Sequence, residues 1–170
     1  MSSINPDYKI SSLTFLLDKS CVPERYFPLA EYKNILVSLG CGRKSDLETL
    51  PASKLVSAGF PEAYIPLLKR FLSLYDPKKD KFKEIEKAFL SPEEKDACRE
   101  LFHLPGVKLT RAMLYYRAGY KTLASVASAT VEEIREKTAS AIKEYSLSCI
   151  VPLPKEIRTH IAVAKAFTDD

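Results

Sequence analysis

The chain has 170 residues, of which 46% are hydrophobic and 28% charged, a composition typical of soluble globular proteins. It contains no apolar run of about 18 residues, so no membrane span is expected. The net charge of +4 permits a nucleic-acid partner without demanding one. Five glycines and eleven prolines favour sharply ended helices over a sandwich of short strands.

The cysteine pattern argues against a metal site. Cys21, Cys41, Cys98 and Cys149 lie far apart, with no Cys-x-x-Cys pair and no histidine at ligand spacing. Free core thiols in a reducing compartment are therefore expected. The N-terminus lacks both the basic start and the apolar stretch of a signal peptide. We expect a cytoplasmic protein without metal or other cofactor.

Apolar periodicity in the first half predicts a series of helices. Ser45-Asp46-Leu47-Glu48 has the form of a capping box that begins at Ser45, and glycines end several of the segments. The predicted helices cover about residues 10–17, 29–39, 45–50, 51–58 and 61–72.

A polar, proline-marked break at 76–80 is a candidate subdomain boundary. Beyond it, Ser91 and Thr130 are predicted helix caps, and Phe89 is predicted on a helix face with Phe82 and Ile85. The predicted helices cover about residues 82–90, 92–103, 112–118, 122–127, 130–145 and 155–167.

These segments predict an all-α fold of two small helical subdomains. We expect an N-terminal helical subdomain at 1–76, connecting helices at 77–98 and a C-terminal domain at 99–170. A faint repeat supports two related units, because Leu39-Gly40-Cys41 and Ala118-Gly119-Tyr120 both lead from a helix through a glycine into a short helix.

The run from Leu104 to Ala112 is the most informative feature of the chain. An apolar residue, a proline and Gly106 precede a helix that begins on basic residues, which predicts a tight hairpin between two helices. The first amides of a helix have no intrahelical acceptor, and the helix dipole adds positive charge there, so an anion is favoured. Lys108, Arg111, Arg117 and Lys121 are candidate phosphate contacts.

Here the sequence resembles a helix-hairpin-helix domain, whose pattern is an apolar residue, Gly-x-Gly, three variable residues and alanine. Gly106, Val107 and Ala112 fit this pattern, and the continuation from Ala118 to Ile134 looks like the second half of a tandem, SAM-like unit. A group of bacterial proteins of unknown function carries a similar tail. The resemblance covers about residues 99–167.

The resemblance implies non-sequence-specific binding of DNA or RNA backbone. The site would comprise backbone amides and basic side chains, at Gly106, Val107, Lys108, Arg111, Arg117 and Lys121. The second glycine of the pattern is replaced by Lys108, which adds charge near a phosphate but restricts the backbone. A protein–protein or scaffold role, with a purely structural hairpin, therefore stays open as the alternative.

Charge does not decide between these two roles. Residues 101–170 hold 10 Lys+Arg and 7 Asp+Glu, against 16 and 15 in residues 1–100, so the basic excess near the hairpin is small. Solvated helix faces of mixed charge are the favoured explanation over a dedicated electrostatic stripe.

No catalytic constellation is found in the sequence, and we expect no enzyme activity. Phosphate-loop, nucleophile-elbow and His-Glu-x-x-His motifs are absent. His103 is expected to be a cap or a satisfied core group, and His160 is expected on a solvated basic face. Tyr115, Tyr116 and Tyr120 are expected to be core residues first, with stacking on bases as the alternative.

Overall fold

The computed structural model describes residues 4–10, 29–74 and 79–168. Within these ranges the chain forms α-helices and one short 3-10 helix, and its only β-type pairings are two isolated bridges. The predicted all-α class is confirmed. The helix expected at 10–17 falls mostly outside the described residues, and Ile10 itself lies in an extended segment.

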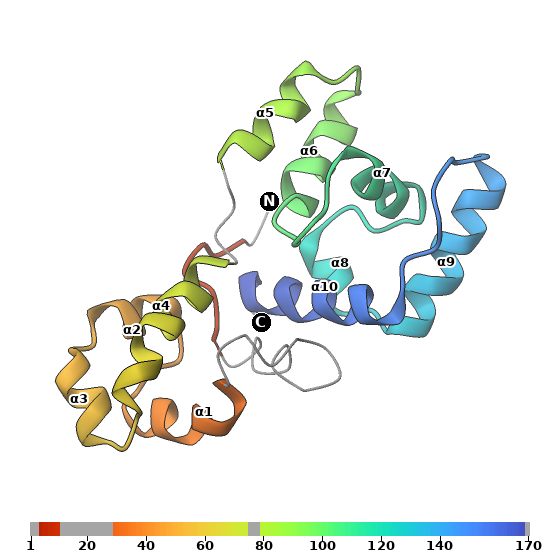
Figure 1. The fold of residues 1–170 in the computed structure, drawn as a ribbon. Helices are drawn as coiled ribbons and strands as arrows, with labels where there is room; N and C mark the ends of the chain where they lie inside the picture. Colours follow the sequence, from red (N-terminus) through yellow and green to blue (C-terminus); the bar gives the residue numbers. More distant parts are fainter. Residues whose placement is uncertain (1–3, 11–28, 75–78, 169–170) are drawn as a thin grey trace.

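The first group of helices packs around Leu36, Leu47, Leu55 and Phe60, all buried. Figure 1 shows this group at the lower left of the molecule. It consists of α1 (Leu29–Ser38), α2 (Lys44–Thr49), α3 (Ala52–Ser57), the 3-10 helix η2 (Glu62–Tyr64) and α4 (Ile65–Leu74).

The second group surrounds the C-terminal helix, which lies directly against the short α8 and also contacts α9 (Figure 1). Ile157, Val163, Ala164 and Phe167 line the buried face of this last helix. The group consists of α5 (Lys79–Lys87), α6 (Pro92–Leu101), α7 (Leu109–Arg117), α8 (Leu123–Ala127), α9 (Val131–Glu144) and α10 (Pro154–Phe167).

Side-chain caps begin three of these helices. The hydroxyl of Ser91 accepts from the Glu94 amide at 3.2 Å, and Thr130 accepts from the Glu133 amide at 3.1 Å, as predicted. Thr122 caps α8 in the same way.

Two local predictions were wrong. Helix α2 begins one residue early, and its N-terminus is held by the Asp46 carboxylate, which accepts from the amides of Gly42 and Arg43 at 3.0 and 2.9 Å. Ser45 instead donates to Asp7, a partner 38 residues away that local patterning does not reveal. Phe89 lies beyond the end of α5 and is fully exposed, because the helix stops two residues earlier.

The predicted repeat has the same backbone geometry at both glycines. Gly40 and Gly119 have φ of +78° and +98°, a region that L side chains avoid. In each case the next residue, Cys41 or Tyr120, donates its amide to the carbonyl five residues earlier, at 2.9 and 2.8 Å. The order helix, glycine, short helix, helix is therefore common to α1–α3 and α7–α9. The prediction that a longer helix follows in both units was wrong for the first, because α3 has six residues whereas α9 has 14.

An extended segment, residues 4–10, joins the two groups. On one side Asn5 and Lys9 donate their amides to the last turn of α10, at 2.7 and 2.9 Å. On the other side Ile10 donates to Gly42, and Tyr8 accepts from Lys44. The buried Tyr8 ring packs on Phe167, so the hydrophobic core runs through both groups. The boundary proposed at residue 76 lies outside the described residues and stays a prediction.

The glycine turn after α7 provides a test of the repeat. Replacing Gly119 by alanine places a Cβ in open space but at a φ of +98°, so we expect a loss of about 1–2 kcal/mol in the free energy of unfolding, measured by urea titration. Gly42→Ala is the matched control, because the backbone there is not left-handed. Equal stability of the two variants would contradict the assigned turn.

Candidate functional site

The predicted hairpin connects α6 to α7 and presents two different sides. Leu104 and Val107 are completely buried, and the Val107 amide donates to the Leu104 carbonyl at 3.2 Å. Gly106, between them, is exposed with a φ of +72°, and Lys108 is exposed as well. The turn is therefore anchored by its apolar residues while its tip stays in solvent.

Lys108 fits the turn without strain. Its φ of −119° and ψ of −170° are extended, so the turn needs a positive φ only at Gly106. The lysine that replaces the second glycine of the resembled pattern therefore leaves the backbone conformation undisturbed.

Lys108 is also the N-cap residue of α7, and a lysine side chain has no acceptor to offer. The N-terminus of α7 consequently has no side-chain cap within the described residues, whereas α6, α8 and α9 are capped. The first amides of α7 therefore have neither an intrahelical acceptor nor a side-chain cap, and they lie at the positive end of the helix dipole.

A second amine reaches the hairpin from α5. The Nζ of Lys81 donates to the Leu104 carbonyl at 3.0 Å and lies 5.7 Å from the centre of the Phe102 ring. Burial lowers the pKa of Lys81, and the nearby charge of Lys108 lowers it further. Two amines that repel one another therefore share this corner of the molecule.

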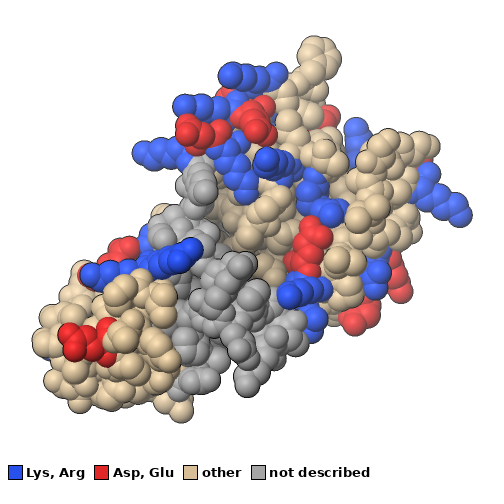
Figure 2. Space-filling model, in the orientation of Figure 1, with Lys and Arg blue, Asp and Glu red and all other residues tan. Residues whose placement is uncertain are grey.

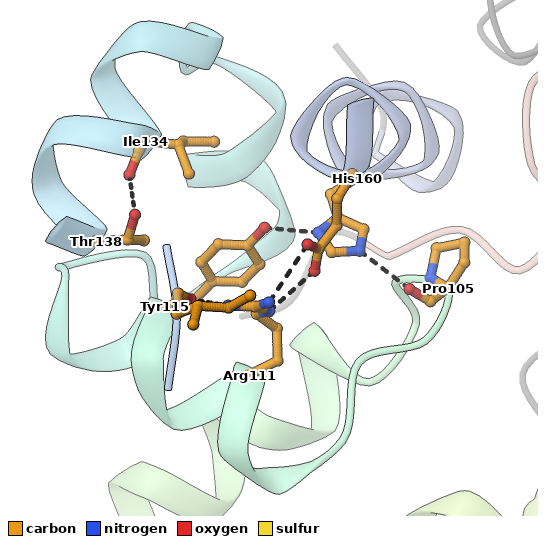
Figure 3. A network of polar contacts seen from close by, with 8 residues as sticks. Pro105, Arg111, Tyr115, Ile134, Thr138 and His160 are labelled. Atoms are coloured by element: carbon orange, nitrogen blue, oxygen red, sulfur yellow. Dashed lines mark hydrogen bonds and ion pairs between the residues drawn. The ribbon is translucent and has the colours of Figure 1, made fainter. Parts of the chain in front are cut away.

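Behind the hairpin lies a buried hydrogen-bonded network (Figure 3). His160 of α10 is 2% exposed; its Nε2 lies 3.0 Å from the Pro105 carbonyl, and its Nδ1 lies 2.6 Å from the Tyr115 hydroxyl. A carbonyl only accepts, so the neutral ring carries its proton on Nε2 and Tyr115 donates to Nδ1. The expectation of a solvated His160 was wrong, because the ring lies on the buried face of α10.

Arg111 points toward α10 rather than toward the tip of the hairpin (Figure 3). Its Nε and one terminal nitrogen contact the two carboxylate oxygens of Glu156 at 2.9 and 3.3 Å. The other terminal nitrogen donates to the Ile150 carbonyl at 3.1 Å, and the side chain is only 19% exposed. Its role in phosphate binding stays a prediction, and the structure shows a different, internal use.

The two remaining candidates lie at the other end of α7. The guanidinium of Arg117 lies 5.8 Å from the Tyr116 ring centre and 5.0 Å from that of Tyr145. Lys121 pairs with Glu93 at 2.8 Å and lies 5.1 Å from the Tyr116 ring. These groups form a cationic, aromatic surface, separate from the hairpin tip.

The tyrosines divide by burial. Tyr115 and Tyr120 are buried core residues, and burial raises the pKa of both hydroxyls. Tyr116 is partly exposed. The expectation that these are core residues first is confirmed for two of the three.

His103, as expected, caps a helix end, because its Nδ1 lies 3.0 Å from the carbonyls of Arg99 and Glu100.

Sequence reasoning missed Lys81, Glu156 and Tyr145 as neighbours of the site. Nothing in the sequence distinguishes Lys81 from the other lysines of the strongly charged α5. His160 had a usable signal, since it lies three residues from both Ile157 and Val163 on one helical stripe.

Within the described ranges, no group of three or more His, Cys, Asp or Glu residues is placed to hold a metal ion. None of the described helices has the length and apolar character needed to cross a membrane. The sequence matches no protein-family model, and neither the curated proteins nor the solved structures include a similar chain. The function must therefore be argued from the geometry.

Tyr115→Phe removes the hydroxyl that donates to His160 and leaves a buried acceptor without a donor. We expect a loss of about 1–2 kcal/mol in the free energy of unfolding, measured by urea titration. Tyr116→Phe, the matched control on the partly exposed neighbour, should change it by less than about 0.5 kcal/mol. Equal losses in the two variants would show that the hydrogen bond between Tyr115 and His160 does not stabilise the fold.

The network also predicts how stability depends on pH. Burial lowers the pKa of His160 to about 4, and the positive charges of Arg111 and Lys81 act in the same direction. In the unfolded chain the histidine has a pKa near 6.5 and binds a proton at a higher pH than in the folded protein. The contribution of His160 to the free energy of unfolding is therefore fully present above about pH 6.5 and is lost as the pH falls toward 4.

Between pH 7 and 5 we expect a loss of about 2 kcal/mol from His160 alone, measured by urea unfolding at each pH. His160→Gln should remove this part of the slope, and the smaller remainder should come from His103, whose pKa is also lowered by burial. An unchanged slope in His160→Gln would contradict the buried neutral imidazole.

Proposed function

We propose that the protein binds the phosphate backbone of nucleic acid, without sequence specificity, at the tip of the α6–α7 hairpin. The observation that carries the proposal is the uncapped N-terminus of α7, which follows Gly106 and has the exposed Lys108 where α6, α8 and α9 have a capping hydroxyl. Backbone amides and a helix dipole directed at solvent are the elements of an anion site.

The lysines add the charge that such a site needs. Lys108 is exposed at the tip, and Lys81 lies close enough for the two charges to influence each other. An incoming phosphate would relieve their mutual repulsion and so gain more than it would from one isolated amine. Contacts of this kind recognise backbone and read no bases.

The wider surface favours a modest affinity that depends only weakly on salt. Figure 2 shows basic and acidic side chains mixed at the top of the molecule over α5, rather than one continuous positive face. Arg111 and Lys121 are already paired with Glu156 and Glu93. Few phosphates would therefore be neutralised, and a shallow salt dependence is expected.

The alternative, a protein-binding scaffold, is favoured by one specific observation. Ile150 and Leu153 are exposed apolar residues in the segment before α10, and the Ile150 carbonyl is held by Arg111. An apolar pair presented on an anchored segment is typical of protein contacts. Under this alternative the hairpin fixes the angle between α6 and α7 and binds nothing.

The test is fluorescence anisotropy of labelled single- and double-stranded DNA and RNA at low and physiological salt. Lys108→Ala should weaken binding severalfold for every sequence and reduce the slope of log affinity against log salt by about 1. Lys54→Ala on α3, in the other helix group, removes the same charge and should have little effect (Figure 1).

No binding at low salt, where electrostatic attraction is strongest, would overturn the nucleic-acid proposal in favour of the scaffold role. Equal weakening by Lys108→Ala and Lys54→Ala would show binding through general charge rather than through the hairpin.

A further inference from the structure

The far end of α7 carries a surface that the hairpin does not explain. Arg117 lies over two tyrosine rings, Tyr116 of its own helix and Tyr145 at the end of α9. Tyr145 is 45% exposed. We call Tyr116, Arg117 and Tyr145 the stacking surface.

Arg117 differs from the other arginines of α6 and α7. Arg111 pairs with the Glu156 carboxylate at 2.9 Å. Arg99 pairs with the carboxylates of Glu86 and Asp96, at 2.7 and 2.6 Å. Among the described residues no carboxylate forms an ion pair with Arg117, and its contacts are ring faces. No carboxylate in the described ranges therefore neutralises its charge.

The backbone holds Tyr145 in this position at a conformational cost. Ser146 has a φ of +51°, a left-handed conformation that is usually taken by glycine at the end of a helix. The following Leu147 amide donates to the Ile142 carbonyl at 3.0 Å and closes the turn. Ser146 thus closes the helix end beside the exposed ring in a conformation that L side chains rarely adopt.

We propose that the stacking surface accepts an unpaired base, so that the protein prefers single-stranded nucleic acid. This inference rests on the proposed phosphate site and adds the class of strand that is bound. A guanidinium plane and an exposed tyrosine ring stack on bases of any sequence, and the bases of a duplex are stacked on one another and not available.

The position of the stacking surface relative to the hairpin is consistent with one strand reaching both. Helix α7 has nine residues and is about 13 Å long. Because the helix is this short, a strand of a few nucleotides can extend from one end of it to the other. The hairpin would hold a phosphate at one end, and the surface would take a base at the other.

Two substitutions separate stacking from charge. Arg117→Lys keeps the positive charge and removes the planar group, and Tyr145→Leu keeps an apolar side chain and removes the ring. Each variant should bind a labelled 20-nucleotide oligothymidine about tenfold more weakly than the wild type, since stacking on one base contributes 1–3 kcal/mol, roughly five- to 150-fold. Binding of a 20-base-pair duplex should change by less than about twofold.

Lys108→Ala is the comparison, because the phosphate site serves both kinds of strand and its loss should weaken both. Circular dichroism melting of each variant verifies that these surface changes leave the fold intact.

The inference is overturned if Arg117→Lys and Tyr145→Leu bind both probes like the wild type, or if they weaken the binding of both probes equally. If Lys108→Ala still weakens the binding of both probes, the proposed function stands without the inference. The inference is also overturned, together with the proposed function, if the wild type binds neither probe at low salt.

Discussion

A neutral imidazole buried between α7 and α10 holds the candidate site in place. His160 binds the Pro105 carbonyl through one ring nitrogen and the Tyr115 hydroxyl through the other, so the hairpin, the helix after it and the last helix meet at one side chain. A buried polar group is stabilising only when every partner is present, because an orphaned donor or acceptor costs more than one bond contributes. The hairpin conformation therefore depends on α10, which lies more than 40 residues later in the chain.

This anchoring explains how one turn has both a buried side and a solvent-facing side. Leu104, Val107 and the Pro105 carbonyl face inward and are satisfied by the core and by His160, which leaves Gly106 and Lys108 at the tip. A rigid turn presents its outward amides in one geometry, so an anion bound there would not have to order the loop. The same rigidity is compatible with a scaffold role, which is why binding at Lys108, rather than the fold, distinguishes the two functions.

The basic residues near the hairpin differ in whether their charge is already paired within the protein. Arg111 is held by two contacts to Glu156 and one to Ile150, geometry that a planar guanidinium provides and an amine does not. Lys108 has a short-range neighbour of its own sign in Lys81, and Arg117 contacts rings rather than carboxylates. Counting charges along the sequence treats these residues as equal, but the tertiary contacts decide which charges remain uncompensated.

The amino-acid sequence by itself determined the helices that local signals specify. Ser91 and Thr130 cap their helices, and Gly40 and Gly119 end theirs, because capping and left-handed turns depend on residues within one turn of the helix. The all-α class and the hairpin position follow from the same signals. Only the tertiary structure decided that Asp46 and not Ser45 holds the start of α2, that His160 is buried, and that Arg111 faces Glu156. Those outcomes depend on partners brought together by packing across tens of residues, and no pattern within a single helix encodes a long-range neighbour.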